Sequence, residues 1–245
     1  SPVVEEEHAE NPSDNKGTFQ WVGVNGTADM GSEENPYNVS SVEHFLAMNV
    51  IINDTGNSNK YFVLTTDLNF NDTVIDSYLL DTQAASGMEG SLVSVNPTLS
   101  SSSVFFHFDG NNKKIYNLNI ENGEHAALSI FGYVNSSSTI TNLTVNNTNI
   151  VNTYGDAQAA GIILKNEGTV KDCNFTIITI DTTASTTKAE SFYPTDDASL
   201  RVYSGTAIVV DNSGVIDNET EYDSSERLVL AENVTIRTSR PYAGV

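Results

Sequence analysis

Five aspartates of this chain lie in or beside apolar stretches that alternate like β-strands, and paired carboxylates are the groups that hydrolyse glycosidic bonds. That reaction needs two carboxyl groups about 5 to 10 Å apart across a groove. Asp109 lies in a turn signature, and Asp172 stands where asparagine stands in similar segments. No cluster of Arg or Lys that would hold an acidic sugar accompanies them. We therefore expect no catalytic residue among the five, which are Asp109, Asp156, Asp172, Asp211 and Asp217.

The residue types that bind metal ions or act as nucleophiles show no suitable arrangement either. The histidines have neither a His-x-x-x-His spacing nor a Ser/His/Asp arrangement, and they are His8, His44, His107 and His125. The single cysteine, Cys173, allows neither a disulfide within the chain nor a cysteine-based zinc site. Calcium loops of the Asp-x-Asp-x-Asp-Gly type are absent, and a solvated acidic surface explains the isolated aspartates better. We predict no metal and no cofactor; the isolated aspartates are Asp76, Asp81, Asp196 and Asp197.

Composition argues against several classes of partner. The 245 residues carry 11 Lys and Arg against 32 Asp and Glu, which gives a formal charge of −21. Nucleic-acid binding requires clustered basic side chains, and an anionic membrane surface repels so acidic a protein. No apolar run is long enough to span a bilayer. Residues 1–17 lack the basic and apolar regions of a signal peptide and are predicted to form an acidic flexible tail.

The elements that would position these side chains repeat along the chain. The stretch from Phe105 to Ile120 predicts a strand, a tight turn over Asp109–Asn112 and a second strand with alternating apolar residues. Its pattern is an aliphatic residue, any residue, Asn or Asp, an apolar residue, any residue and an apolar residue. The pattern returns at Ile140–Val145 and Val170–Phe175, at intervals of about 25 to 30 residues, which is typical of solenoids.

Aligning the three copies assigns roles to single positions. The short polar side chains are expected where the strand turns, where they can bond nearby backbone groups or stack as a ladder. Cys173 takes the slot of Leu118 and Leu143 in this alignment, so we expect it to be a buried small hydrophobe. The aligned polar residues are Asn117, Asn142 and Asp172.

Second apolar segments lie between the copies. Gly132 and Gly161 within them suit positions where the backbone bends or packs too closely for a side chain. One repeat therefore consists of an apolar strand, an Asn/Gly turn, a second strand and a polar return. The segments are Leu128–Val134, Ala160–Leu164 and Thr206–Val210. A weaker last copy of the strand pattern lies at Ala231–Ile236.

The part of the chain before the repeats is expected to cover the open end of the stack. A strand is predicted over Thr18–Val24, with Trp21 packed on the core or cap. Ser40 as N-cap with Glu43 forms a capping box for a helix over Ser40–Asn49, and His44 is expected to be exposed. Two polar loops are also predicted, over Asp81–Ser103 and Asp181–Ser199.

Several of these segments carry a resemblance to a known group of proteins. The run Phe108–Leu118 resembles the strand signature of bacterial cell-surface β-helix proteins, and Ala160–Cys173 is similar to their Gly-rich GLUG repeat. The segments Pro36–Leu46 and Tyr61–Phe70 fit the start of that fold, and the resemblance covers residues 35–177 well. It implies a right-handed parallel β-helix in a secreted or wall-attached adhesin or spacer of Gram-positive bacteria. It implies no catalytic residue.

The sequence thus predicts an all-β protein: a right-handed parallel β-helix with an N-terminal cap that contains one short helix. Residues 1–17 would form the tail, 18–103 the cap and entering strands, and 104–245 the coils, within one continuous domain. We expect a non-catalytic extracellular adhesion or spacer module that binds a host or matrix glycan or protein. The alternative is a polysaccharide-degrading β-helix enzyme, because this fold hosts lyases and glycoside hydrolases as well.

Overall fold

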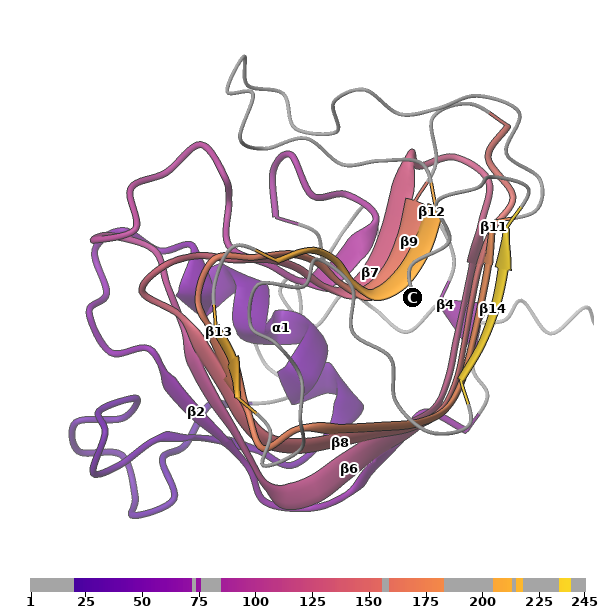
Figure 1. The fold of residues 1–245 in the computed structure, drawn as a ribbon. Helices are drawn as coiled ribbons and strands as arrows, with labels where there is room; N and C mark the ends of the chain where they lie inside the picture. The colour runs from indigo at the N-terminus through magenta and orange to yellow at the C-terminus, as the bar shows by residue number, and fades with distance from the viewer. Residues whose placement is uncertain are drawn as a thin grey trace, which may run out of the picture.

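The fold was analysed in a computed structural model, which describes residues 20–71, 74–75, 85–155, 159–182, 205–212, 215–217 and 234–238. These residues form a mostly β structure of two parallel sheets with one short α-helix, as the alternating apolar pattern predicts (Figure 1). No helix among them is long and apolar enough to cross a membrane.

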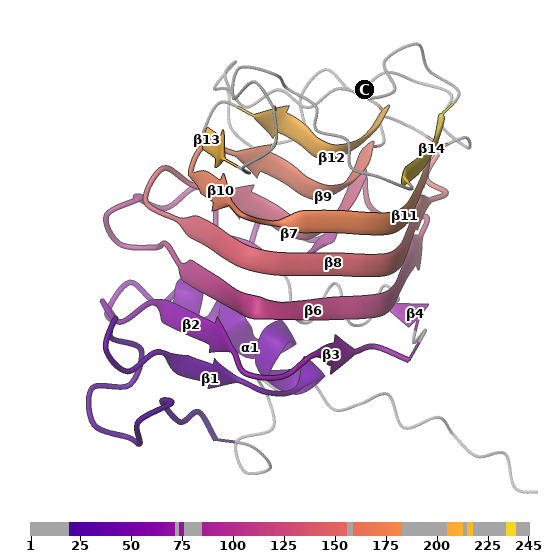
Figure 2. The same cartoon turned by 60° about the horizontal axis from the view of Figure 1, so that its bottom comes forward.

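The strands of the larger sheet stack on one another in parallel (Figure 2). Ile120, Ile150 and Ile180 stand directly opposite one another in three neighbouring strands, at an interval of 30 residues. All three are fully buried, because alternate residues of each strand face the core. The strands are β1 (Tyr37–Val39), β2 (Tyr61–Leu64), β3 (Leu68–Asn69), β4 (Val74–Ile75), β6 (His107–Asn122), β8 (Thr139–Asn152), β10 (Thr169–Lys171), β11 (Asn174–Thr182), β13 (Val215–Asp217) and β14 (Val234–Thr238).

Three of the four strands of the smaller sheet come from the second apolar segments. Its strands pair in parallel in the order β12, β9, β7, β5. The core lies between the two sheets, where the ring centroids of Phe108 and Phe131 are 6.3 Å apart. Gly132 of β7 allows the segment around β5 to pack closely against it, because a Cβ there would stand 2.6 Å from Met88 Cε and from Ser91 Oγ. The strands are β5 (Ser91–Val93), β7 (Ala127–Val134), β9 (Ala159–Asn166) and β12 (Gly205–Asn212).

The larger sheet bends at two corners, and the backbone at both has left-handed φ angles. At the first corner φ is 57° for Asn112, 53° for Asn142 and 53° for Asp172. At the second it is 56° for Asn117, 47° for Asn147 and 54° for Ile177. Asn and Asp tolerate this conformation better than other non-glycine residues. The turns predicted at Asn117, Asn142 and Asp172 are therefore confirmed.

The predicted alignment of those residues is wrong, however. Leu118 pairs with Thr148, so Asn117 belongs with Asn147 rather than with Asn142. Cys173 does stand opposite Leu143, in register with the neighbouring pair of Asn174 and Thr144. The two corners need the same residue chemistry and lie close together in sequence, so one motif fits either of them.

Helix α1 (Val42–Ile52) begins one residue later than predicted. Its N-cap is Ser41, whose Oγ accepts the N–H of His44 at 3.1 Å. The His44 imidazole then reaches back toward Ser40, whose N–H lies 3.4 Å from Nδ1, so histidine takes the place that Glu holds in a capping box. His44 is half-buried against Trp21 at 4.9 Å and not exposed as predicted, whereas Trp21 packs on the core as expected.

The same helix closes the hydrogen-bonding edge of the smaller sheet beside β5. The Asn49 side chain donates to Leu92 O at 2.7 Å and accepts from Ser94 N at 2.8 Å. One turn later, Asn53 donates to Ser94 O at 3.0 Å and accepts from Asn96 N at 2.7 Å. Two asparagine amides thus supply the bonds that another strand would make, so this edge is not left open to other chains.

A buried lysine completes the end of the helix. Lys60 is fully buried, and its Nζ donates to the carbonyls of Ile51, Ile52 and Asp54 at 2.5, 2.9 and 2.8 Å. These carbonyls belong to the end of α1, where backbone acceptors have no partner within the helix. Burial lowers the pKa of Lys60 to about 8, and the charge of Asp54 opposes that change. Lys60 therefore serves as a C-terminal cap supplied from outside the helix.

Two further predictions need correction. The segment over 81–103 is not simply a loop, since Ser91–Val93 form β5 and residues 90–95 are all buried. Its Ser, Gly and Ala residues pack closely against β7 and α1. A composition rich in such small residues is also typical of loops, so composition alone does not indicate this strand. The described part of the predicted strand over Thr18–Val24 makes only isolated bridges at Gly23. Residues 1–17 and most of the predicted loop over Asp181–Ser199 lie outside the described residues.

Candidate functional site

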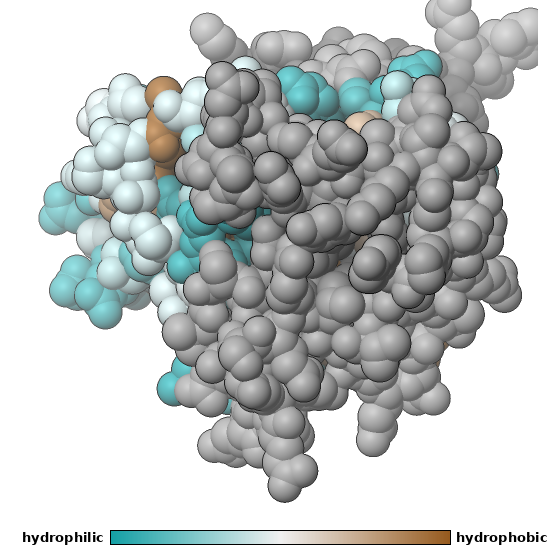
Figure 3. Space-filling view, turned by 45° about the horizontal axis from the view of Figure 1, so that its top comes forward, coloured by the Kyte–Doolittle hydropathy of each residue, from teal (hydrophilic) through white to brown (hydrophobic). Residues whose placement is uncertain are grey.

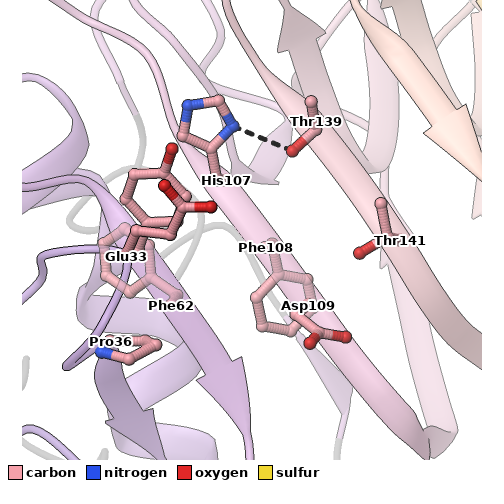
Figure 4. Close-up of a pocket in the computed structure, with 9 residues that line it drawn as sticks. Glu33, Pro36, Phe62, His107, Phe108, Asp109, Thr139 and Thr141 are labelled. Atoms are coloured by element: carbon pink, nitrogen blue, oxygen red, sulfur yellow. Dashed lines mark hydrogen bonds between the residues drawn. The ribbon is translucent and has the colours of Figure 1, made fainter.

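A pocket of about 230 Å³ opens on the outer face of the larger sheet, where β2, β6 and β8 begin. Its floor consists of outward side chains from those strands, and Glu33 and Pro36 from the loop before β1 form one wall (Figure 4). A pocket that joins apolar and polar groups from several segments is the usual form of a small-ligand site.

The strand alternation places these side chains on one face. Phe62, Phe108 and Ile140 are buried and stand opposite one another across β2, β6 and β8. Their neighbours in sequence must therefore point outward. The outward side chains form two rows across the strands, of which the first is Tyr61, His107 and Thr139 and the second is Val63, Asp109 and Thr141.

The first row is held by direct contacts. The Tyr61 and His107 rings stack with centroids 4.4 Å apart and planes 27° apart. On the other side of the imidazole, Nδ1 of His107 lies 2.9 Å from Thr139 Oγ1 (Figure 4). Burial lowers the pKa of His107, against the opposing charge of Glu33, so the imidazole is neutral at pH 7. Burial raises the pKa of Tyr61, and the charges of Glu33 and Glu34 raise it further.

Two carboxylates line the pocket from different elements. Figure 4 shows Glu33 near His107 and Asp109 farther along β6. Asp109 is oriented by the Asn111 N–H, which donates to its Oδ1 at 2.7 Å, and by Asn142 Nδ2 at 3.3 Å. Among the described residues that line the pocket there is no Lys or Arg. The site therefore presents an aromatic stack, hydroxyls and negative charge.

The outer face continues beyond the pocket as a polar track. Thr169 follows Thr139 in register, and Lys171 follows Thr141. Neighbouring strands are about 4.8 Å apart, so the rows repeat at that spacing. The space-filling view brings the top of Figure 1 forward, and the described residues visible there are mostly white to teal, with few brown ones (Figure 3).

The residues singled out from sequence are widely dispersed. Only Asp109 and His107 belong to the pocket; Asp172 stands exposed at a corner. Asp211 lies in β12 in register with Lys165, and Asp217 lies in β13 in register with Lys171. His8 and Asp156 lie outside the described residues, as do the calcium candidates Asp76, Asp81, Asp196 and Asp197.

No motif in the sequence points to Glu33, Tyr61 or the two threonines of the pocket. The alternation in Tyr61–Leu64 and His107–Asp109 identifies which side chains face outward. It does not identify which strands are neighbours, and that pairing is what brings Tyr61 onto His107. Nothing in the sequence marks Glu33.

Other titratable groups lie in the interior. Lys165 of β9 is buried and pairs with Glu167 through Nζ and Oε1 at 3.1 Å, while the Tyr133 hydroxyl donates to Glu167. A buried ion pair of this kind carries no evidence of chemistry. Cys173 is buried, and burial raises its pKa to about 12, so it packs as the small hydrophobe expected. Among the residues that the structure describes, no group of three His, Cys, Asp or Glu side chains is arranged to hold a metal.

Comparison of the chain with known protein families, curated proteins and solved structures gave no match.

Proposed function

We propose that the chain is a right-handed parallel β-helix with α1 in its N-terminal cap. Three observations support this architecture: the parallel stacking of both sheets, the 30-residue interval at Ile120, Ile150 and Ile180, and the edge of β5 covered by Asn49 and Asn53. Left-handed corners at equivalent positions agree with a coil that repeats its path. A circular dichroism spectrum that is largely helical would contradict the proposal.

The function that the geometry supports best is that of a non-catalytic adhesion or spacer module, secreted or displayed at the cell surface, that binds a glycan. The observation that carries it is the row of Tyr61, His107 and Thr139 across three strands, with its stacked rings and its fixed hydroxyl. A pyranose presents C–H groups on its faces and hydroxyls at its rim. An aromatic stack with a few convergent polar groups is complementary to both.

Two features of the sequence support the proposed location outside the cell. The segments Phe108–Leu118 and Ala160–Cys173 resemble cell-surface repeats, and a charge of −21 keeps such a protein soluble. A host or matrix protein is the other class of partner that such a module would bind.

The alternative function is a polysaccharide-degrading enzyme, and one observation favours it. Glu33 and Asp109 line the same pocket, and glycoside hydrolysis requires a pair of carboxylates. Binding and cleavage would then share one site.

One experiment separates these functions. The purified protein is screened on a glycan array, and each polysaccharide that binds is incubated with it and analysed for cleavage products. We expect binding without products, lost in Tyr61→Ala and in His107→Ala. Tyr116→Ala is the matched control, because Tyr116 lies in the same strand as His107 but outside the pocket.

Cleavage that disappears in Glu33→Gln and Asp109→Asn would refute the non-catalytic adhesion function and support the enzyme function. An array without any bound glycan would overturn glycan binding and leave a protein ligand or a plain spacer.

A further inference from the structure

The charges around the pocket distinguish among saccharides. Glu33 and Asp109 line it, and the charge of the neighbouring Glu34 contributes to the raised pKa of Tyr61. The nearest basic side chain in the second row is Lys171, two strands from Asp109 and about 10 Å away at the usual strand spacing. An anionic sugar in this pocket would meet two carboxylates and no cation.

The imidazole of His107 does not add positive charge to the pocket. His107 is half-buried and held between the Tyr61 ring and the Thr139 hydroxyl. Its neutral form leaves the pocket with the charge of the two carboxylates alone. The field of the whole protein has the same sign, since its formal charge is −21. A cation approaching the pocket is therefore attracted at long range as well as at contact.

The aromatic rings and threonines of the pocket indicate which kind of molecule would carry the positive charge. A simple ammonium ion or a lysine side chain would use the carboxylates but not the stacked rings or the threonines. Thr139 and Thr141 stand side by side on neighbouring rows, and the track continues over Thr169 in the next strand. Hydroxyls in rows, with an aromatic stack, suit a polymer of sugars rather than an isolated amine.

Resting on the glycan-binding function put forward above, we propose that this pocket recognises a saccharide with free amino groups, such as a de-N-acetylated hexosamine polymer. The sugar ring lies against the Tyr61–His107 stack, and its ammonium group lies between Glu33 and Asp109. N-acetylation removes the positive charge and so removes this interaction. Uronic acids are excluded by repulsion.

The test compares three oligosaccharides of equal length by isothermal titration calorimetry: glucosamine oligomers, their N-acetylated counterparts and oligogalacturonate. We expect the glucosamine oligomer to bind at least about tenfold more tightly than the N-acetylated one, a difference of about 1.4 kcal/mol. Oligogalacturonate is expected not to bind. The preference should weaken in high salt, because screening reduces the attraction of exposed charges.

Variants of the two carboxylates test whether they cause the preference for the glucosamine oligomer. Glu33→Gln with Asp109→Asn is expected to abolish the tenfold preference, so that the two hexosamine oligomers bind with about equal affinity. Asparagine keeps the oxygen that accepts the Asn111 N–H, so the turn at Asp109 is preserved. Glu121→Gln is the control, since Glu121 is an exposed carboxylate of the same strand outside the pocket.

Three results would overturn the inference. Equal affinity for the two hexosamine oligomers would refute the amine while leaving glycan binding intact. Tight binding of a lysine oligomer, unaffected by the double variant, would show attraction by net charge alone. Binding of no saccharide, neutral or charged, would refute the glycan function itself and the inference with it.

Discussion

The side-chain amide of Asn147 donates a hydrogen bond to Oδ1 of Asn117 at 2.5 Å, and both residues have left-handed backbones. Asn117 in turn donates to Asn69 Oδ1 at 2.9 Å. The corner is therefore lined by an asparagine ladder that runs from one repeat to the next. Ile177 occupies the next position with φ of 54° and has no amide to continue it.

Replacing Ile177 by asparagine is expected to stabilise the protein. A left-handed backbone costs an L-residue about 1 to 2 kcal/mol, and a β-branched side chain is among the least suited to it. Ile177 is 52% exposed, so little apolar burial is lost. We expect Ile177→Asn to raise the free energy of unfolding by about 1 kcal/mol in urea titrations. Ile177→Val keeps the strain and is the control; a destabilised Ile177→Asn would show that the isoleucine packs usefully.

Removing the Asn49 amide should destabilise the closed edge of the smaller sheet. Asn49→Leu keeps the volume but leaves Leu92 O and Ser94 N buried without this partner. Each such group costs about 1 to 3 kcal/mol, so we expect a loss of about 3 kcal/mol by thermal or urea unfolding. Val50→Ala tests the helix alone, because Val50 is 58% exposed. Similar losses in both variants would mean that α1 matters only through helix stability.

Lys60→Met is expected to lower the free energy of unfolding by about 2 kcal/mol at pH 7, because the carbonyls at the end of α1 lose a charged donor. Hydrogen exchange should show fraying of the last turn of the helix. Lys171→Met, an exposed lysine of β10, is the control and should change stability little.

The effect of Lys60 should also depend on pH. Its pKa is about 8 in the folded protein and 10.5 for an ordinary lysine. Between these values the unfolded chain holds a proton that the folded protein has released, so this lysine makes stability rise with pH. The difference in unfolding free energy between wild type and Lys60→Met should therefore increase from pH 8 to pH 10.5. A constant difference over this window would mean that Lys60 keeps its proton.

Cys173 is expected to be unreactive until the protein unfolds. Burial raises its pKa to about 12, and the thiolate is the reactive form. A chromogenic disulfide reagent at pH 8 should give no signal from native protein and one equivalent of thiol in denaturant. Rapid modification of the native protein would show that the strand around Cys173 opens readily.

Local patterns in the sequence anticipated much of the fold. The apolar segments predicted over Leu128–Val134, Ala160–Leu164 and Thr206–Val210 form β7, β9 and β12. Alternation and turn formation depend on residues close together in the sequence, so both can be predicted without knowledge of the fold. The candidate site is much harder to predict from the sequence. Only His107 and Asp109 are candidates there, and no pattern links either of them to a partner residue.

What the sequence by itself determined is therefore the type of element and the residues that face inward. Tertiary structure alone decided the register that sets Asn117 on Asn147, the burial of β5, and the meeting of Tyr61, His107 and Glu33. The physical reason is the range of the interactions involved. Alternation depends on residues two positions apart, whereas register and pocket depend on hydrogen bonds and packing between segments about 30 or more residues apart.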